Sequence, residues 1–394
     1  MRIDLLTREY PPYVYGGAGI HVEALAKYLR QYYDVRVHCL GASDPGSDAT
    51  VSWHEPPPHL ADPALQALAA DVSMVQGVRG AALVHSHTWY TNFAGHTAKI
   101  LYDMPHVITT HSLEPLRPWK QAQLGSGYRL SSYLERSALT AADLVIAVSH
   151  AMAEDVTRVY PSIDPSRIAV VHNGVDASEF HPDHGTDALE STGVRLDHPI
   201  VVCIARITPQ KGLGHLLRAS QYFASGTQLV VVAQHADSPA HQQQFQRALD
   251  GLHKNGVNAI WLSDTVERRT IIQLLTHATT LVCPSIYEPQ GIVNLEAMAC
   301  GTAVIGTATG GIPEVVVDGE TGLLIPFKPA ADGTVGPAEP AVFAKEIAAR
   351  VNHLLDNPGI ADAMGAAGRH RALAEFSWQS AADRVAELYN VVSR

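Results

Sequence analysis

The chain has 394 residues, of which 46% are hydrophobic and 17% are charged, and its formal net charge is -11 at pH 7. This length exceeds what one hydrophobic core usually fills, so we expect two compact globular domains of roughly 150 to 200 residues. The negative charge argues against binding to nucleic acid or to an anionic membrane surface, because both partners recruit basic surfaces.

The N-terminal segment and the cysteines favour a reduced, cytoplasmic setting. The apolar residues 1–7 are followed by Arg8, Glu9 and two prolines, which is unlike a signal peptide, and no later stretch is long enough to span a bilayer. We therefore expect a cytoplasmic protein without stable membrane association. The four cysteines are scattered among apolar segments without metal-ligand spacing, so we expect free core thiols at Cys39, Cys203, Cys283 and Cys300.

The first half of the chain predicts a doubly wound α/β domain with a parallel sheet. Short β-branched runs alternate with amphipathic helical patterns, which is typical of βαβ units. The predicted strands cover residues 3–7, 35–40, 82–87, 106–111, 144–149 and 168–173. Two of the intervening helices are predicted over residues 21–30 and 131–141.

The same alternation restarts after Pro199 and predicts a second domain of the same kind. Its strands are predicted over residues 200–206, 228–233, 259–262, 280–284, 303–307 and 322–326. Pro, Gly, Asp and His replace the apolar periodicity in residues 179–197, so we assign residues 1–182 to the first domain and 183–376 to the second. A loop predicted over residues 328–340 precedes three helices, of which the last, 378–392, has an apolar stripe to bury.

A glycine-rich run follows the first predicted strand. Ligands of open parallel sheets bind beyond the carboxyl ends of the strands, so residues that follow strands are the first candidates. Here Gly16, Gly17 and Gly19 open a helix, where the backbone can approach a ligand closely and the helix N-terminus offers N–H groups to an anion or a hydroxyl. A tight turn without a ligand is the alternative.

A histidine ends the fourth predicted strand. His111 at this position can hydrogen-bond a sugar hydroxyl, Trp119 offers a face for a pyranose ring, and Arg117 or Lys120 can meet a phosphate. A buried core histidine is the alternative.

His85 and His87 alternate at the end of the preceding strand. No carboxylate lies at metal-ligand spacing beside them or beside His111, so we expect no metal site.

Two cations follow the first strand of the second half. Arg206 and Lys211 lie on a strand-to-helix loop, where a forked guanidinium and a compact ammonium can converge on a diphosphate. In an acidic chain they are the strongest anion-site candidate, and ordinary surface charge is the alternative.

Two carboxylates flank a predicted helix start after the strand at 280–284. Gly291 turns the chain into a helix whose first N–H groups, from Ile292 and Val293, can receive a phosphate. Carboxylates accept hydrogen bonds from vicinal hydroxyls, so Glu288 suits the sugar and Glu296 the ribose. The alternative is that both carboxylates are ordinary helix-start charges, which the helix dipole favours without any ligand.

Together these motifs resemble the family 4 glycosyltransferases of GT-B fold, over nearly the whole chain. The resemblance rests on Arg206 with Lys211, on Glu288 and Glu296 with seven residues between them, and on the runs 296–301 and 310–314. It implies two Rossmann-like domains facing across a cleft, with a C-terminal helix, about 377–394, that packs back on the first domain. It also implies retention of anomeric configuration without a metal or other cofactor.

Within that family, residues 6–12, 16–22 and 110–120 are similar to the actinobacterial glycogen synthase type, whose activity is α-maltose-1-phosphate synthesis. This resemblance implies transfer of glucose from ADP-glucose to α-glucose 1-phosphate through an α-1,4 bond, on the route to α-glucans. It implies a catalytic set, His111, Arg206, Lys211 and Glu288. It further implies donor-binding residues Gly17, Gly19, Arg206, Lys211, Gly291, Ile292, Val293 and Glu296, and acceptor-binding residues Arg8, Arg117, Trp119 and Lys120.

Other functions remain open from the residues alone. They are direct extension of glycogen, transfer from GDP-mannose or a UDP-sugar, epimerisation of a sugar nucleotide, and non-catalytic sensing of a nucleotide or sugar. The expected partners are a nucleotide-sugar and a sugar phosphate, and a homodimer is compatible with the sequence.

Overall fold

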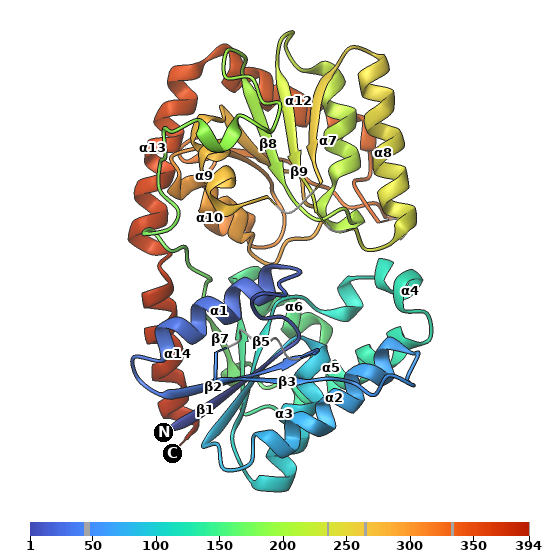
Figure 1. Cartoon of the computed structure of the whole chain (residues 1–394), viewed down its shortest axis with the longest axis vertical. Helices are drawn as coiled ribbons and strands as arrows, with labels where there is room; N and C mark the ends of the chain where they lie inside the picture. Colours follow the sequence, from blue (N-terminus) through green and yellow to red (C-terminus); the bar gives the residue numbers. More distant parts are fainter. Residues whose placement is uncertain (43–47, 235, 264–265, 332–334, 394) are drawn as a thin grey trace. The chain divides into compact units, whose positions relative to one another are not determined.

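The computed structural model contains two parallel α/β units (Figure 1). It describes residues 1–42, 48–234, 236–263, 266–331 and 335–393. The first unit comprises Met1–Asn173 and Trp378–Arg394, and the second comprises Gly174–Ser377. This confirms the predicted fold class of two parallel-sheet domains.

The first unit is built on a parallel sheet with the strand order β3-β2-β1-β4-β5-β6-β7. Its strands are β1 (Arg2–Thr7), β2 (Asp34–Leu40), β3 (Val51–His54), β4 (Leu83–His87), β5 (His106–Thr110), β6 (Leu144–Ala147) and β7 (Ile168–Val170). Its helices are α1 (Gly17–Leu29), α2 (Pro63–Gly77), α3 (Trp89–Tyr102), α4 (Trp119–Leu124), α5 (Gly127–Ala141), α6 (His150–Val159) and α14 (Trp378–Val392). The order reverses between β1 and β4, so the loops that follow these strands meet at a topological switch point.

The last helix, α14, returns to the first unit and lies beside α1 (Figure 1). The Tyr32 hydroxyl donates to Asp383 Oδ1 over 2.6 Å, and the hydroxyl of the fully buried Tyr389 lies 2.6 Å from His85 Nδ1. The apolar stripe predicted for this helix is therefore buried in the first unit, as the resemblance implied.

The second unit is built on a parallel sheet with the strand order β10-β9-β8-β11-β12-β13. Its strands are β8 (Ile200–Ile204), β9 (Gln228–Val232), β10 (Asn258–Leu262), β11 (Thr280–Cys283), β12 (Ala303–Thr307) and β13 (Gly322–Ile325). Its helices are α7 (Leu213–Ala219), α8 (Pro239–Lys254), α9 (Arg268–His277), α10 (Ile292–Ala299), α11 (Ile312–Val315), α12 (Pro340–Asp356) and α13 (Pro358–Glu375). Its switch point lies between β8 and β11.

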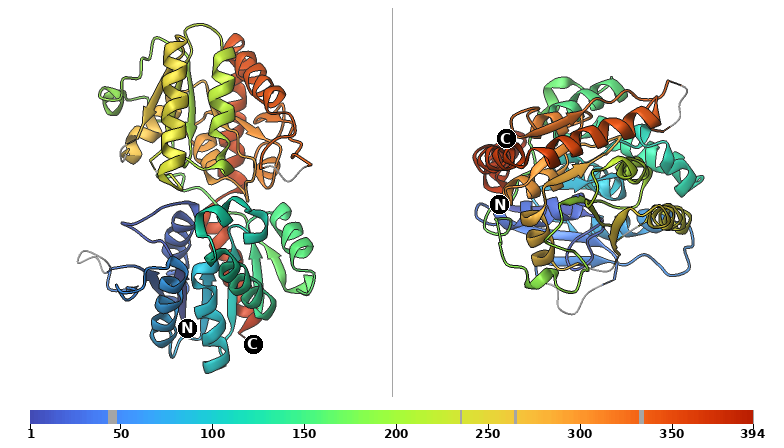
Figure 2. Two further views of the ribbon diagram at one scale, coloured as in Figure 1. Left: turned by 90° about the vertical axis from the view of Figure 1, so that its right-hand side faces the viewer. Right: turned by 90° about the horizontal axis from the view of Figure 1, so that it is seen from above.

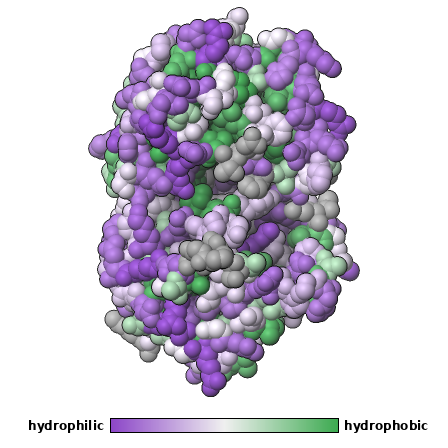
Figure 3. Space-filling model, viewed as in Figure 1, coloured by the Kyte–Doolittle hydropathy of each residue, from purple (hydrophilic) through white to green (hydrophobic). Residues whose placement is uncertain are grey.

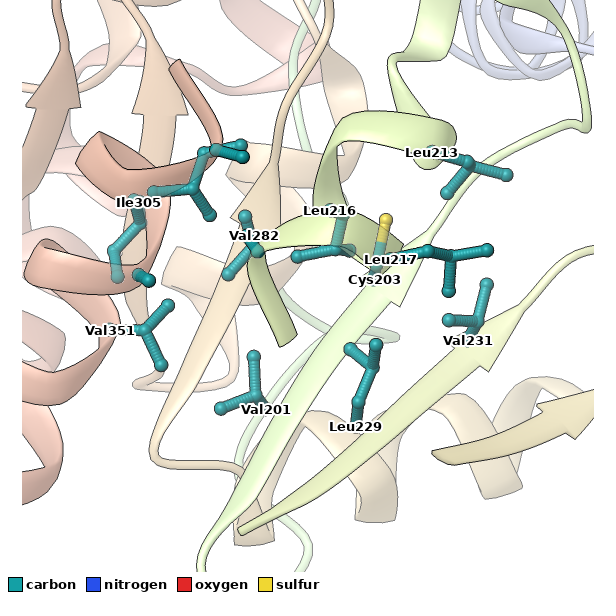
Figure 4. Packing of buried hydrophobic residues seen from close by; sticks show 14 of the residues in the cluster. Val201, Cys203, Leu213, Leu216, Leu217, Leu229, Val231, Val282, Ile305 and Val351 are labelled. Atoms are coloured by element: carbon teal, nitrogen blue, oxygen red, sulfur yellow. The ribbon is translucent and has the colours of Figure 1, made fainter. Parts of the chain in front are cut away.

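Alternation along the strands of the second unit serves two hydrophobic cores. In β8, Val201 and Cys203 join the cluster drawn in Figure 4, which also includes residues of α7, α8 and α12. Their neighbours Ile200 and Val202 join the cluster on the other face, with residues of α9 and α10. Because both faces are covered, the strands read as continuous apolar runs, and Figure 2 shows helices on both sides of the strands in each unit.

The start of the second unit lies earlier than the predicted start at residue 183. The Val175 N–H donates to Phe376 O over 2.9 Å, and Val175 and Phe180 are both buried in a core of the second unit. The segment between these two apolar residues is mostly polar, so no local periodicity marks them.

The protein presents a largely polar face, and its cysteines lie inside. Hydrophilic residues cover most of the face drawn in Figure 3. Among the described residues, no helix combines the length and apolar character that a membrane crossing requires. All four cysteines are free and buried.

Candidate active site

The two predicted cations follow β8 at the switch point of the second unit. The Lys211 ammonium donates to Glu288 Oε2 over 2.6 Å, and Arg206 Nη1 lies 3.2 Å from Oδ1 of Asp237, whose side chain is 3% exposed. Each cation therefore has a carboxylate beside it and retains some exposure through which an anion can reach it. Asp237 was missed from the sequence because it follows a different strand, β9.

Gly212 holds the loop that carries Lys211 against the end of β11. Its φ of +65° is left-handed, and a Cβ there would lie 1.9 Å from the backbone oxygen of Pro284. The Ile286 N–H also donates to Gln210 O over 2.9 Å. Only glycine permits this approach, and the approach places Lys211 beside Glu288.

Glu288 is a buried carboxylate, 5% exposed, in the loop between β11 and α10. Besides the Lys211 ammonium, the Ser285 hydroxyl donates to its Oε2 over 2.8 Å. The Gly310-Gly311 run supports its backbone, since the Gly311 N–H donates to Glu288 O over 3.0 Å and a Cβ at Gly310 would lie 1.9 Å from that oxygen. The run 310–314, one of the motifs behind the family resemblance, thus helps to fix the backbone position of Glu288.

The chain enters α10 through Gly291, which has a φ of +91°. The N–H groups of Ile292 and Val293 belong to the first turn, which has no acceptor within the helix and can receive an anion. Glu296 lies one turn further on, half-buried, and burial raises the pKa of its carboxyl to about 7. The structure thus brings Lys211, Glu288 and Gly291 together, whereas Arg206 contacts Asp237 and Glu296 lies further along α10.

The glycine-rich run of the first unit is tied to a carboxylate that the sequence reasoning missed. Glu9 Oε2 accepts hydrogen bonds from the backbone N–H groups of Tyr15 and Gly16, over 2.9 and 2.7 Å. Gly17 is exposed at the start of α1, whereas Gly19 is buried where a Cβ would lie 3.0 Å from Glu9 Cβ. The sequence signal that could have revealed Glu9 is its position directly after β1, where ligand-binding residues are expected.

Arg8 lies against two tyrosine rings. Its guanidinium carbon is 4.1 Å from the ring centroid of Tyr90 and 5.5 Å from that of Tyr15. Burial raises the pKa of Tyr90, and the positive charges of Arg8 and Arg117 oppose that rise. Arg8, one of the three predicted acceptor-site cations, therefore lies against the ring of Tyr90, a residue that was not predicted.

The remaining acceptor-site candidates lie on the segment after β5. Arg117 Nη1 donates to Ser112 Oγ over 3.0 Å and lies 3.3 Å from Glu114 Oε1. Trp119 begins α4 and is half-buried, while Lys120 is buried, with 6% of its surface exposed.

A buried carboxyl pair supports this segment and was also missed. Glu114 is 1% exposed and accepts from the Ser131 hydroxyl over 2.8 Å. Glu135 Oε1 accepts from the Glu114 N–H over 2.9 Å and from the Tyr160 hydroxyl over 2.5 Å. Burial raises the pKa of Glu135 to about 8. The four residues of this network come from three separate segments of the chain, so their sequence spacing does not indicate that they meet.

His111 lies among other histidines of the first unit. Its Nε2 is 3.1 Å from Nδ1 of His87, and its ring centroid is 4.6 Å from that of His21. Burial lowers the pKa of His111 well below its usual value, so the imidazole is neutral near pH 7. His111 retains partial exposure, whereas His21 and His87 are buried, so a ligand can reach it.

Two parallel-sheet units of this kind characterise the GT-B glycosyltransferases, and solved structures of such enzymes match the whole fold. Sucrose-phosphate synthase from Thermosynechococcus elongatus matches with a TM-score of 0.80 and 23% identity, over 99% of this chain and 98% of that one. Anabaena HepE in complex with UDP-glucose matches with a TM-score of 0.77 and 20% identity, over 99% and 100%.

The sequence narrows this class to a family. Residues 15–179 match Glycosyltransferase Family 4, and residues 186–371 match Glycosyl transferases group 1. The chain belongs to this family of glycosyltransferases and is a transferase enzyme. It is 48% identical to α-maltose-1-phosphate synthase of Mycolicibacterium smegmatis over 396 residues and 47% identical to that of Mycobacterium tuberculosis over 397 residues, with 100% of each chain covered. It is therefore a glycosyltransferase of that type.

Proposed function

We propose that the protein transfers glucose from ADP-glucose to α-glucose 1-phosphate, with retained anomeric configuration and without a metal or other cofactor. The product is α-maltose 1-phosphate, joined by an α-1,4 bond. The observation that carries the choice of substrates is the 48% identity to α-maltose-1-phosphate synthase over the whole chain.

The second unit supports the donor half of the proposal. Arg206 and Lys211 supply two positive charges at the switch point, and the first turn of α10 supplies N–H groups and a positive dipole end. In the proposed complex the Lys211 ammonium leaves Glu288 and binds the diphosphate. The Glu288 carboxylate then accepts hydrogen bonds from glucose hydroxyls. Glu296 accepts from the ribose hydroxyls.

The chemical step is a substitution on one face of the sugar. The acceptor 4-hydroxyl oxygen bonds to glucose C1, the bond from C1 to the diphosphate oxygen breaks, and the hydroxyl proton passes to that leaving oxygen. Negative charge grows on the diphosphate, so Arg206 and Lys211 lower the barrier by stabilising it. His111 accepts or donates a hydrogen bond at a glucose hydroxyl as a neutral imidazole.

The first unit supports the acceptor half. Arg8, which lies over the Tyr90 ring, and Arg117, which lies beside Ser112, provide cations for the acceptor phosphate, and Trp119 provides a ring face for the sugar. The buried carboxyl pair holds the segment that carries Arg117. Lys120 belongs to the same proposed group, and 6% of its surface is exposed.

One incubation tests the proposal. The purified chain is mixed with ADP-glucose and α-glucose 1-phosphate in EDTA, and the products are identified by mass and by the proton coupling at the new anomeric centre. We expect ADP and an α-linked disaccharide phosphate. Parallel reactions replace ADP-glucose by UDP-glucose or GDP-mannose, replace the acceptor by glycogen, or omit the acceptor. Preferential extension of glycogen would identify a glycogen synthase instead. Faster transfer from UDP-glucose or GDP-mannose would identify another donor, and an isomerised nucleotide-sugar without acceptor would identify an epimerase.

A further inference from the structure

Three histidines from separate elements of the first unit meet in one place. His21 comes from α1, His87 from the end of β4, and His111 follows β5, and one nitrogen of each lies within 4.8 Å of those of the other two. His87 Nδ1 and His111 Nε2 are 3.1 Å apart. Zinc with nitrogen ligands at 2.0–2.1 Å in a tetrahedron separates them by about 3.3 Å, so the His87–His111 pair already has nearly this spacing, and His21 lies close enough to approach it.

His21 is already oriented as a metal ligand would be. Its Nδ1 lies 2.6 Å from the amide oxygen of Asn173, which only accepts hydrogen bonds, so Nδ1 carries the proton and Nε2 presents a lone pair. Metal-binding histidines are commonly held in this way by an oxygen on the other ring nitrogen. The Nε2 atoms of His21 and His87 are buried and have no hydrogen-bond partner among the described residues. Unpaired buried nitrogens are costly, and a cation removes that cost at His21.

The three rings are largely shielded from water, because His21 and His87 are buried and His111 is only partly exposed. The Trp378 ring of α14 lies against His21, with ring centroids 5.5 Å apart. His111 is the partly exposed member of the group and leaves one side open to an entering ion.

We propose that His21, His87 and His111 form a binding site for one transition-metal dication of the Zn²⁺ class. Imidazole nitrogen is a preferred ligand of such ions, and three of them leave a fourth position for water. The strand spacing of His85 and His87 did not reveal this group, because His21 lies on a helix far away in sequence.

The site regulates the enzyme by inhibition, a consequence that rests on the proposed function. That function assigns His111 to a glucose hydroxyl, and a metal ion on its nitrogen removes that contact and occupies the space of the sugar. The reaction itself uses no metal, so Zn²⁺ at this site lowers the rate.

Binding is tested on the metal-free full chain, without substrates. We expect one Zn²⁺ per chain by isothermal titration calorimetry, and intense visible bands of four-coordinate Co²⁺ on titration with cobalt. His21→Gln and His87→Gln should each weaken binding at least tenfold and remove the Co²⁺ bands. His59→Gln, at an exposed histidine of the same unit, should bind like the unchanged chain. Equal binding by all four proteins would overturn the assignment.

X-ray absorption of the zinc-loaded, unsubstituted chain covers the case in which a variant does not fold. Three imidazoles around zinc support the site, and fewer than three overturn it. Inhibition is then measured separately, in the transferase assay with Zn²⁺ added. Full turnover by the zinc-saturated enzyme contradicts the inhibitory role alone, whereas failure of the transferase reaction with intact metal binding contradicts the proposed function alone.

Discussion

Single residues of the second unit combine two roles, because each proposed phosphate-binding cation also neutralises a buried carboxylate. Arg206 lies beside Asp237, and Lys211 beside Glu288. Removal of either cation leaves a buried charge without its partner, which destabilises the fold as well as the transition state. Experiments on these residues must separate the two effects.

We expect Arg206→Ala and Lys211→Ala to lower kcat at least tenfold, since loss of one contact to a developing charge typically costs about 3 kcal/mol. The double variant Arg206→Ala/Asp237→Asn also removes the buried charge, so it should melt near the unchanged protein and remain slow. Steady-state kinetics and thermal melting check both points. Arg218→Ala, at an exposed arginine of α7, is the matched control with normal turnover. Recovery of normal kcat in the double variant would show that Arg206 acts on stability alone.

Glu296 predicts a pH dependence of donor binding. Its pKa is raised to about 7 by burial, so the carboxylate form, which we propose accepts hydrogen bonds from the ribose hydroxyls, is present mainly above that pH. We expect the KM for ADP-glucose to fall by up to about tenfold from pH 6 to pH 8, as the deprotonated fraction rises. Glu296→Gln should flatten this change, and Glu320→Gln, at an exposed carboxyl of the same unit, should not. A slope that persists in Glu296→Gln would assign the titration to another group.

At the scale of elements, tight backbone contacts join loops that are far apart in sequence. The loop after β8 lies against Pro284 at Gly212, whereas Gly214, two residues on in α7, has nothing within 4 Å of its Cβ position. These two glycines therefore offer a comparison within one loop-helix segment.

Gly212→Ala should lower the melting temperature and raise the KM for the donor, because it adds a clash with Pro284 O to the about 1–2 kcal/mol cost of a left-handed alanine. Gly214→Ala should leave donor binding unchanged and stabilise the helix by up to about 1 kcal/mol. Melting curves and donor saturation curves provide the measurements. Similar behaviour of the two variants would mean that the loop tolerates displacement of Lys211.

The periodicity of the sequence located most elements but missed the edge strand β3. Val51–His54 has only four residues, and its apolar side chains are half-buried, so it makes no apolar run. The other twelve strands in the described part of the chain were predicted within a few residues, because strands covered on both faces are continuously apolar.

The candidate site was predictable to the extent that its residues follow strands. Arg206, Lys211 and Glu288 follow β8 and β11, and strand order brings those ends together. Partners such as Asp237 and Glu135 were not predictable, because their role depends on a side-chain contact with a distant segment. The assignment of each residue to a substrate remains a prediction.

At the scale of the whole molecule, buried histidines are distributed unequally between the units. In the described part of the first unit, burial lowers the pKa of seven histidines: His21, His54, His85, His87, His96, His106 and His111. In the described part of the second unit it lowers that of His215. A histidine with a lowered folded pKa contributes stability above its unfolded pKa of about 6.5 and loses it as the pH falls, by up to about 1.4 kcal/mol per pH unit.

Carboxyls with a raised pKa act in the opposite direction, since their contribution grows as the pH falls. Among the described residues of the first unit, two such carboxyls are buried, Asp71 and Glu135, and they offset only part of the histidine effect. In the second unit Glu296 opposes His215, so the two changes largely cancel. The stability of the first unit therefore depends more strongly on pH between about 6.5 and 4.

We expect the first unit to open before the second on acidification. Hydrogen exchange by mass spectrometry, corrected for the pH dependence of intrinsic exchange, should show that peptides of β4 and β5 lose protection between pH 7 and pH 5. Peptides of β8 and β11 should keep theirs. His106→Gln, which removes one group with a pKa lowered to about 3, should reduce the slope of stability against pH in the first unit. Earlier loss of protection in the second unit would show that groups other than these histidines control acid unfolding.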